Sequence, residues 1–325
     1  GLNNYGAAAV ILAEILEERG DKGWRQTLLT AKEDKPIQFR SLTLSPKDLP
    51  NREFLNLSFE ILDAISLTDA APRDVLSTLD EAFLDPLKRQ EFFVPRWLAD
   101  FLIHLGQLGS DTVVLDISSH YGNVLAAALM SSKETSPSSV WGASPSIRNV
   151  LWAQVQLALL APQEGEVVLG GYPPYEIREA SKLPTPTHII SAPPFGHRIS
   201  KPDAASRLLS KSASSRFSSE VLYLELALDW VQSEGRVVLI VPEGLMFQGG
   251  NFRKIRELVY EDARITGIIG LPHGALRPIT SIKSSVLILD KTPFREPYDI
   301  FMSVIKEFTA KDTFDSRDIS QVANV

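Results

Sequence analysis

The feature that most constrains the fold is an alternation of short apolar runs with amphipathic segments, which begins near residue 89. Apolar runs typical of buried strands lie at 112–117, 139–143, 166–169, 188–191, 236–241, 265–270 and 284–289. Segments with helical spacing lie between them, at 95–105, 124–130, 150–160, 220–232 and 252–260. Strands that alternate with helices form βαβ units, so the pattern predicts an α/β, Rossmann-like, doubly wound and mainly parallel sheet.

The first 88 residues follow a different pattern, with apolar positions at helical spacing in 7–16, 57–65 and 75–84. Ser58 is a candidate N-cap for a helix that starts at Phe59, with Leu57 packing onto Leu62. We therefore predict an N-terminal helical domain over 1–88 and an α/β domain over 89–325.

Composition excludes several classes of protein. An apolar content of 44% in 325 residues supports a full core. No stretch approaches the ~18 apolar residues of a membrane span, and no secretion signal is visible, so a cytoplasmic protein is expected. There are no cysteines, and the five histidines show no metal-ligand spacing, so no metal is expected. A net charge of −7 disfavours nucleic-acid binding by the whole surface, though a local basic face remains compatible with it.

Ligands of such sheets bind beyond the carboxyl ends of the strands. The first strand ends at Asp116, and a loop over 117–122, here called the first loop, leads through Gly122 into a helix. A carboxylate and a glycine placed in this way suit a nucleotide-like cofactor. The G-x-G-x-x-G pattern of dinucleotide oxidoreductases is missing, and an ordinary βα turn is the alternative.

A second candidate, here called the Pro-Pro-Phe segment, spans 192–196 and follows the run at 188–191. Pro193 and Pro194 fix two φ angles and form a stiff platform, and Phe195 could stack on a flat ligand. A rigid turn with a buried phenylalanine is the alternative. The loop from Leu271 to Gly274 and the segment 280–285 form a third candidate. An ordinary loop that leads into a β-hairpin is the alternative.

Six segments in this order resemble the methylation subunits of type I restriction-modification systems, which are N6-adenine DNA methyltransferases. Residues 91–96 (EFFVPR) resemble F-Y-T-P-R-E, residues 116–125 stand where the family has D-P-A-C-G-S-G-G-F-L, and residues 191–196 (SAPPFG) where it has A-N-P-P-F-G. Residues 241–247 resemble L-P-N-G-V-L-F, residues 268–272 resemble V-I-G-L-P, and 282–291 resemble the closing strand. The resemblance covers about 89–291.

The resemblance implies S-adenosylmethionine as cofactor. The positions that it assigns to the cofactor are Phe92, Pro95, Asp116, His120, Gly122, Ser144 and Gly171. Several of them depart from the family pattern. His120, Tyr121 and Asn123 replace small residues, while Ser144 and Gly171 stand where carboxylates grip the ribose and approach the adenine ring.

The resemblance also implies that Ala192, Pro193, Pro194 and Phe195 form the catalytic segment, which holds an extruded adenine. Ala192 stands where an asparagine accepts a hydrogen bond from the N6 amino group, and an alanine methyl cannot do so. Strand alternation points Ser191 elsewhere. Two hypotheses follow: a methyltransferase with reduced activity, or a non-catalytic DNA-binding or assembly subunit. Closure of the first loop by His120 and Tyr121 would favour the second.

The stretch after the Pro-Pro-Phe segment is locally basic. Between 196 and 216 there are five basic residues and one acidic residue, Asp203, which gives a local charge of +4. The basic residues are Arg198, Lys201, Arg207, Lys211 and Arg216. These five residues are candidates for DNA contact, and a solvated, serine-rich loop is the alternative. DNA and a specificity or restriction subunit are the expected partners.

Overall fold

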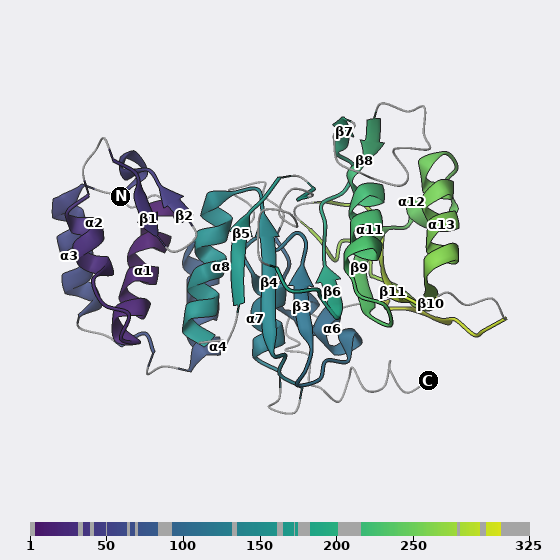
Figure 1. The fold of residues 1–325 in the computed structure, drawn as a ribbon, viewed down its shortest axis with the longest axis horizontal. Helices are drawn as coiled ribbons and strands as arrows, with labels where there is room; N and C mark the ends of the chain where they lie inside the picture. The colour runs from purple at the N-terminus through teal and green to yellow at the C-terminus, as the bar shows by residue number, and fades with distance from the viewer. Residues whose placement is uncertain are drawn as a thin grey trace.

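A computed structural model describes residues 4–31, 35–39, 42–49, 51–63, 66–68, 71–83, 93–131, 135–160, 165–171, 173–174, 183–200, 216–277, 280–292 and 297–306. Figure 1 shows a central sheet with a group of N-terminal helices at one end. No described helix is long and apolar enough to cross a membrane.

The central sheet has eight strands in the order β12-β10-β11-β9-β6-β3-β4-β5. Their bounds are β3 Val113–Asp116, β4 Ser139–Ser144, β5 Gly165–Leu169, β6 His188–Ser191, β9 Arg236–Pro242, β10 Arg264–Gly270, β11 Ser284–Asp290 and β12 Phe301–Val304. Strand β11 runs antiparallel to β9 and β10, and every other pair is parallel. The α/β prediction is confirmed, and the seven expected strands agree to within one residue at each end. Strand β12 was not expected.

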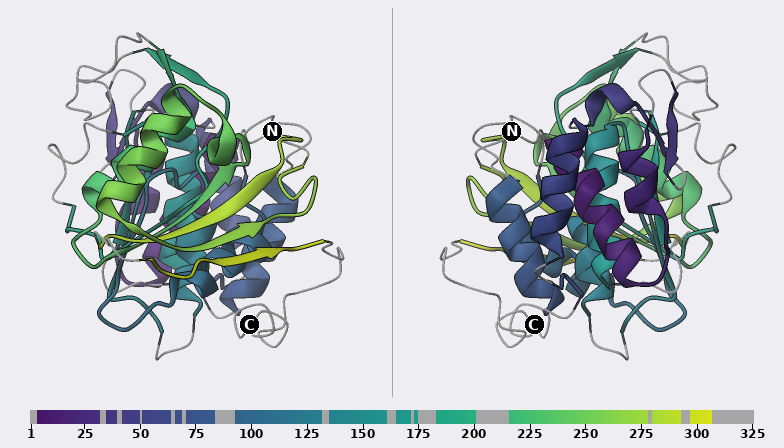
Figure 2. Two further views of the ribbon diagram at one scale, coloured as in Figure 1. Left: turned by 90° about the vertical axis from the view of Figure 1, so that its right-hand side faces the viewer. Right: turned by 90° about the vertical axis from the view of Figure 1, so that its left-hand side faces the viewer.

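Helices cover both faces of this sheet (Figures 1 and 2). One face carries α6 (Arg96–Gly106), α7 (Asn123–Leu129) and α8 (Ile147–Leu160), and the other carries α11 (Ser219–Trp230) and α13 (Asn251–Asp262). Strand alternation divides the core accordingly. Val238 and Ile240 of β9 belong to the cluster under α6, α7 and α8, whereas Val237 and Leu239 belong to the cluster under α11 and α13.

The N-terminal segment is helical, with one addition. Its elements are α1 (Asn4–Glu18), α2 (Trp24–Leu29), a 3-10 turn (Pro46–Asp48), α3 (Arg52–Leu62) and α4 (Pro72–Phe83), plus an unexpected hairpin of β1 (Ile37–Phe39) and β2 (Leu42–Leu44). Helix α1 packs on α8, and its apolar side chains join the same buried cluster as those of α6, α7 and α8. A domain boundary at residue 88 stays a prediction.

The prediction that a helix starts at Phe59, with Ser58 as its N-cap, was wrong. Helix α3 begins at Arg52, and Asn51 is its N-cap, whose side chain accepts a hydrogen bond from the backbone N–H of Phe54 at 2.9 Å. Ser58 lies inside the helix and donates its hydroxyl to the carbonyl of Phe54 at 2.7 Å. Asparagine caps as well as serine does, so the apolar spacing alone did not select the correct residue.

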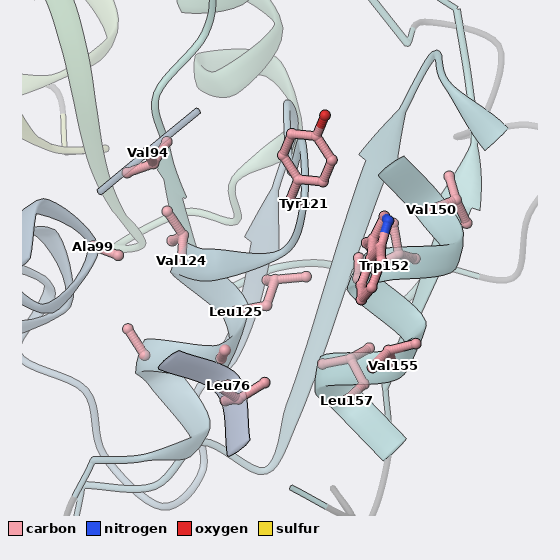
Figure 3. Packing of buried hydrophobic residues seen from close by; sticks show 14 of the residues in the cluster. Leu76, Val94, Ala99, Tyr121, Val124, Leu125, Val150, Trp152, Val155 and Leu157 are labelled. Carbon is pink, nitrogen blue, oxygen red and sulfur yellow. The ribbon is translucent and has the colours of Figure 1, made fainter. Parts of the chain in front are cut away.

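Helices α7 and α8 pack closely beneath the first loop. In Figure 3 the side chains of Leu125 on α7 and Trp152 on α8 point into the space between the two helices. Both side chains are buried, and so is Leu76 of α4 beside them. The start of α7, which follows the first loop, and the α8 surface against which it packs are therefore held by the core.

Candidate functional site

The candidate residues converge because four neighbouring strands are parallel. Strands β3, β4, β6 and β9 pair in the same direction, so their carboxyl ends share one edge of the sheet. The first loop follows β3, and the Pro-Pro-Phe segment follows β6. The two candidate loops therefore follow neighbouring strands, at the edge of the sheet where the sequence predicted a ligand site.

Asp116, the last residue of β3, is turned toward the adjacent strand. Its Oδ1 accepts hydrogen bonds from the Ser191 hydroxyl at 2.5 Å and from the backbone N–H of Ser118 at 3.0 Å. The residue is 1% exposed, and this burial raises the pKa of Asp116 to about 7 even though both hydrogen bonds oppose the shift. The Ser191 hydroxyl is therefore hydrogen-bonded to Asp116 and does not replace the asparagine missing at position 192.

Gly122 is required by the way the first loop enters α7. Its φ is +89°, and an added Cβ would lie 2.8 Å from Cβ and 2.9 Å from Cα of Ala153 on α8. The loop is further tied to β4, because the backbone N–H of Ser119 donates to the Ala143 carbonyl at 2.8 Å. The sequence predicted that a cofactor would approach the backbone of Gly122, but in the structure helix α8 packs there.

His120 bridges the first loop and the Pro-Pro-Phe segment. Its Nε2 lies 3.1 Å from the carbonyl oxygen of Ala192 and 3.2 Å from the hydroxyl of Ser118. The residue is 8% exposed, and burial lowers the pKa of His120 to about 4, so the imidazole is neutral near pH 7. Its φ of +46° is uncommon for a residue with a side chain.

Tyr121 and Asn123, the other large residues at positions where small ones were expected, are also part of the packing. Tyr121 is 3% exposed, with its ring centroid 6.2 Å from that of Phe93. The Asn123 amide donates to the Val94 carbonyl at 2.9 Å, and its Oδ1 accepts from Gln156 Nε2 at 2.8 Å. Gln156 Nε2 also donates to the Tyr121 carbonyl. These contacts join the first loop to residues 93–94 and to α8.

In this arrangement the residues do not fit S-adenosylmethionine. Every residue from 114 to 128 is buried, and the imidazole of His120 lies between the first loop and Ala192. Ser144 is 1% exposed and its hydroxyl accepts only a long hydrogen bond, 3.4 Å, from the Ser146 N–H among the contacts described. Gly171 is half-buried and brings no carboxylate. Pro95 is the N-cap of α6, and Phe92 lies outside the described residues.

The Pro-Pro-Phe segment is held from the opposite side by the start of α11. The Ser219 hydroxyl donates to the Pro194 carbonyl at 2.9 Å, and the Glu220 carboxylate accepts from the Gly196 N–H at 3.2 Å. Ala192, Pro193 and Pro194 are buried, and Phe195 is half-buried. Sequence reasoning missed Ser219 and Glu220, because their hydrogen-bond partners lie 25 and 24 positions earlier in the chain and no local pattern records such pairs.

The structure only partly describes the five basic candidates for DNA contact. Arg198 is exposed in β7 (Arg198–Ser200), and Arg216 begins β8 (Arg216–Ser218), which pairs antiparallel with β7. Lys201, Arg207 and Lys211 lie outside the described residues. Among the residues with described positions, no group of three His, Asp or Glu side chains could hold a metal ion.

Comparison with known proteins gives a consistent assignment. The family model described as N-6 DNA Methylase matches residues 72–324. A type I restriction enzyme EcoEI methylase subunit from Escherichia coli is 23% identical over 256 residues, which are 75% of this chain and 52% of that protein. The chain thus spans about half the length of the curated relative it matches.

Solved structures agree on the fold. A modification subunit of a putative type I restriction enzyme from Vibrio vulnificus superposes with a TM-score of 0.66 at 18% identity, covering 93% of this chain and 68% of that one. A putative class I S-adenosylmethionine-dependent methyltransferase from Listeria monocytogenes gives 0.65 at 16% identity, covering 99% and 97%. The fold is that of S-adenosylmethionine-dependent methyltransferases, and the chain belongs to the N-6 DNA methylase family.

Proposed function

We propose that this chain is a DNA adenine-N6 methyltransferase module of a restriction-modification system in which methyl transfer is strongly reduced. Family membership supports the reaction class, and S-adenosylmethionine is the methyl donor that such chemistry uses. The observation that carries the reduction is Ala192, which is fully buried beside Pro193 at the end of β6. Pro193, Pro194 and Phe195 keep the platform on which an extruded base would lie.

The chemical argument rests on one missing acceptor. An amide oxygen at position 192 would accept a hydrogen bond from the N6 amino group and direct its lone pair toward the methyl group. The methyl of Ala192 cannot accept, and the Ser191 hydroxyl is engaged by Asp116. Losing a single pre-positioned hydrogen-bonding group of this kind costs about 100- to 1000-fold in rate.

The test is transfer of tritiated methyl groups to mixed DNA by wild type, Ala192→Asn and Ala192→Leu. Leucine matches the shape of asparagine without its acceptor, so a gain limited to the asparagine variant would identify the hydrogen bond. The gain requires that the cofactor also binds, because both substrates must meet in one site. Robust transfer by the wild type would contradict the proposal.

A second candidate, a non-catalytic DNA-binding or assembly subunit, is favoured by the contact of His120 with Ala192. That contact joins the first loop to the Pro-Pro-Phe segment at the edge of the sheet where such folds bind their ligands. If wild type and both variants transferred no methyl groups, and none of them bound S-adenosylmethionine measurably, this role would be favoured.

The partners that fit either role are DNA and a specificity or restriction subunit. The basic stretch of Arg198, Lys201, Arg207, Lys211 and Arg216 supplies the proposed DNA contact, and Arg198 is exposed. Because the proposed substrate is DNA, the protein is expected to act in the cytoplasm. The division into a helical domain over 1–88 and an α/β domain over 89–325 is likewise part of this proposal.

A further inference from the structure

His120 has no part in the proposed reaction, yet it joins the two loops that would have to receive its substrates. The first loop comes from β3 and the Pro-Pro-Phe segment from β6, 72 positions later in the chain. The hydrogen bond between His120 Nε2 and the Ala192 carbonyl, here called the latch contact, spans them at 3.1 Å.

The chemistry of the contact defines the state of the imidazole. A carbonyl oxygen can only accept, so the contact requires the proton on Nε2. The Ser118 hydroxyl, 3.2 Å from the same nitrogen, then lies beside that N–H as a second acceptor. Ser118 in turn donates its backbone N–H to Asp116, which binds Ser191 of β6. The first loop and β6 are therefore joined twice, by His120 and by Asp116.

Holding His120 in this position has conformational and solvation costs. Its backbone lies in the left-handed region, at φ +46°, where a residue with a side chain loses roughly 1–2 kcal/mol. Its ring is 8% exposed, and burial makes protonation unfavourable, which lowers the pKa of His120 to about 4. Contacts on both loops offset these costs, so the closed arrangement depends on them.

We propose that His120 is an internal latch, whose imidazole takes the space between the first loop and the Pro-Pro-Phe segment and keeps the cofactor site shut in the absence of a ligand. S-adenosylmethionine then binds only to the fraction of molecules in which the imidazole has moved out. The inference depends on the proposed function only for the identity of the ligand. Its test involves neither DNA nor methyl transfer, so failure of the transfer assay leaves it standing.

A closed state lowers apparent affinity by the fraction of molecules that are open. Removing the side chain removes the latch contact, the bulk of the ring and the left-handed strain together. His120→Gly should therefore bind S-adenosylmethionine at least about tenfold more tightly than wild type. His120→Gln is the matched control, because its amide keeps an N–H donor at similar reach and keeps a side chain in the same space.

Calorimetry of the full chain with S-adenosylmethionine compares wild type, His120→Gly and His120→Gln, each shown to be folded by circular dichroism. Tight binding by the glycine variant alone is the expected result. Equal affinity of wild type and His120→Gly would overturn the proposal, and so would a folded glycine variant that binds no better than the glutamine one.

A second measurement on the wild type keeps the proposal testable if the glycine variant does not fold. Nitrogen NMR of the histidine rings in the absence of S-adenosylmethionine should show His120 neutral, protonated on Nε2, and unchanged between pH 5 and pH 8. A His120 signal that titrates near the ordinary value of about 6.5 would show that the latch contact does not form in solution.

Discussion

At the scale of single residues, Asp116 and His120 are buried titratable groups whose pKa values move in opposite directions. Burial raises the pKa of Asp116 from 3.8 to about 7, so the folded chain keeps a proton that the unfolded chain releases near pH 4. Its contribution to stability is full below pH 4 and is lost as pH rises toward 7. Burial lowers the pKa of His120 from 6.5 to about 4, so its contribution is full above pH 6.5 and is lost as pH falls toward 4.

These two slopes oppose each other between pH 4 and pH 6.5, which gives a prediction from single variants. Asp116→Asn keeps the acceptor for Ser191 and Ser118 but cannot titrate. Relative to wild type, its free energy of unfolding should rise with pH across this window. His120→Gln should do the opposite: relative to wild type, its free energy of unfolding should fall from pH 4 to pH 6.5. Each slope is at most about 1.4 kcal/mol per pH unit.

Urea unfolding of the three proteins at several pH values measures these slopes directly. If Asp116→Asn and wild type gave parallel curves, the carboxyl would have an ordinary pKa, and its burial against Ser191 would not exist in solution. Parallel curves for His120→Gln and wild type would contradict the burial of the imidazole in the same way.

At the scale of elements, the close approach of the first loop to α8 depends on Gly122. This residue is the N-cap of α7, with φ 89° and ψ 11°, and it faces the backbone of Ala153. Gly23, the N-cap of α2, has a similar conformation, with φ 101° and ψ −4°, and an added Cβ would meet nothing within 4 Å. A side chain at Gly23 would therefore cause backbone strain alone, whereas one at Gly122 would cause strain and steric overlap.

Gly122→Ala should lower the free energy of unfolding by about 2–4 kcal/mol, because left-handed strain adds to overpacking against α8. Gly23→Ala should lose only the strain, about 1–2 kcal/mol. Chemical denaturation of both variants checks the difference. Equal losses would mean that α8 moves away freely, and that close packing of α7 on α8 does not define the first loop.

At the scale of the whole molecule, charge limits how the chain meets DNA. The net charge is −7, so contact with phosphates has to come from a local basic surface. The stretch from Arg198 to Arg216, with a local charge of +4, is such a segment, and it follows the Pro-Pro-Phe segment directly in the chain.

Replacing Lys201, Arg207 and Lys211 by glutamate should abolish DNA binding and its dependence on salt, since each lost phosphate contact removes about 0.9 from the logarithmic salt slope. Reversal of three exposed cations elsewhere, Lys22, Lys47 and Arg52, changes the net charge equally and is the control. Fluorescence anisotropy with labelled duplex DNA measures both. Unchanged affinity in the first triple variant would place the DNA site elsewhere or on a partner.

The sequence by itself determined the type of fold and the strand ends that carry the candidate site. Burial of strands and of helix faces leaves a local record, a period of two or of 3.6 residues, that can be read without knowing the partners. Asp116, Gly122 and Ala192 were located because Asp116 ends such a strand, Gly122 closes the loop after it, and Ala192 directly follows another strand. The loss of the acceptor at Ala192 was also visible, because it depends on one side chain's chemistry.

Only the tertiary structure decided how the site is filled. The contacts of Ser191 with Asp116 and of His120 with Ala192 join residues 75 and 72 positions apart, and no periodicity records such pairs. Strand β12 and the β1–β2 hairpin are short, and their pairing partners, not their own composition, make them strands. From the sequence, His120 was a large residue in a place for a small one and a candidate to close the first loop, but its partner was not visible. That its ring lies against the Ala192 carbonyl follows from the pairing of β3 with β6, which brings the two loops together.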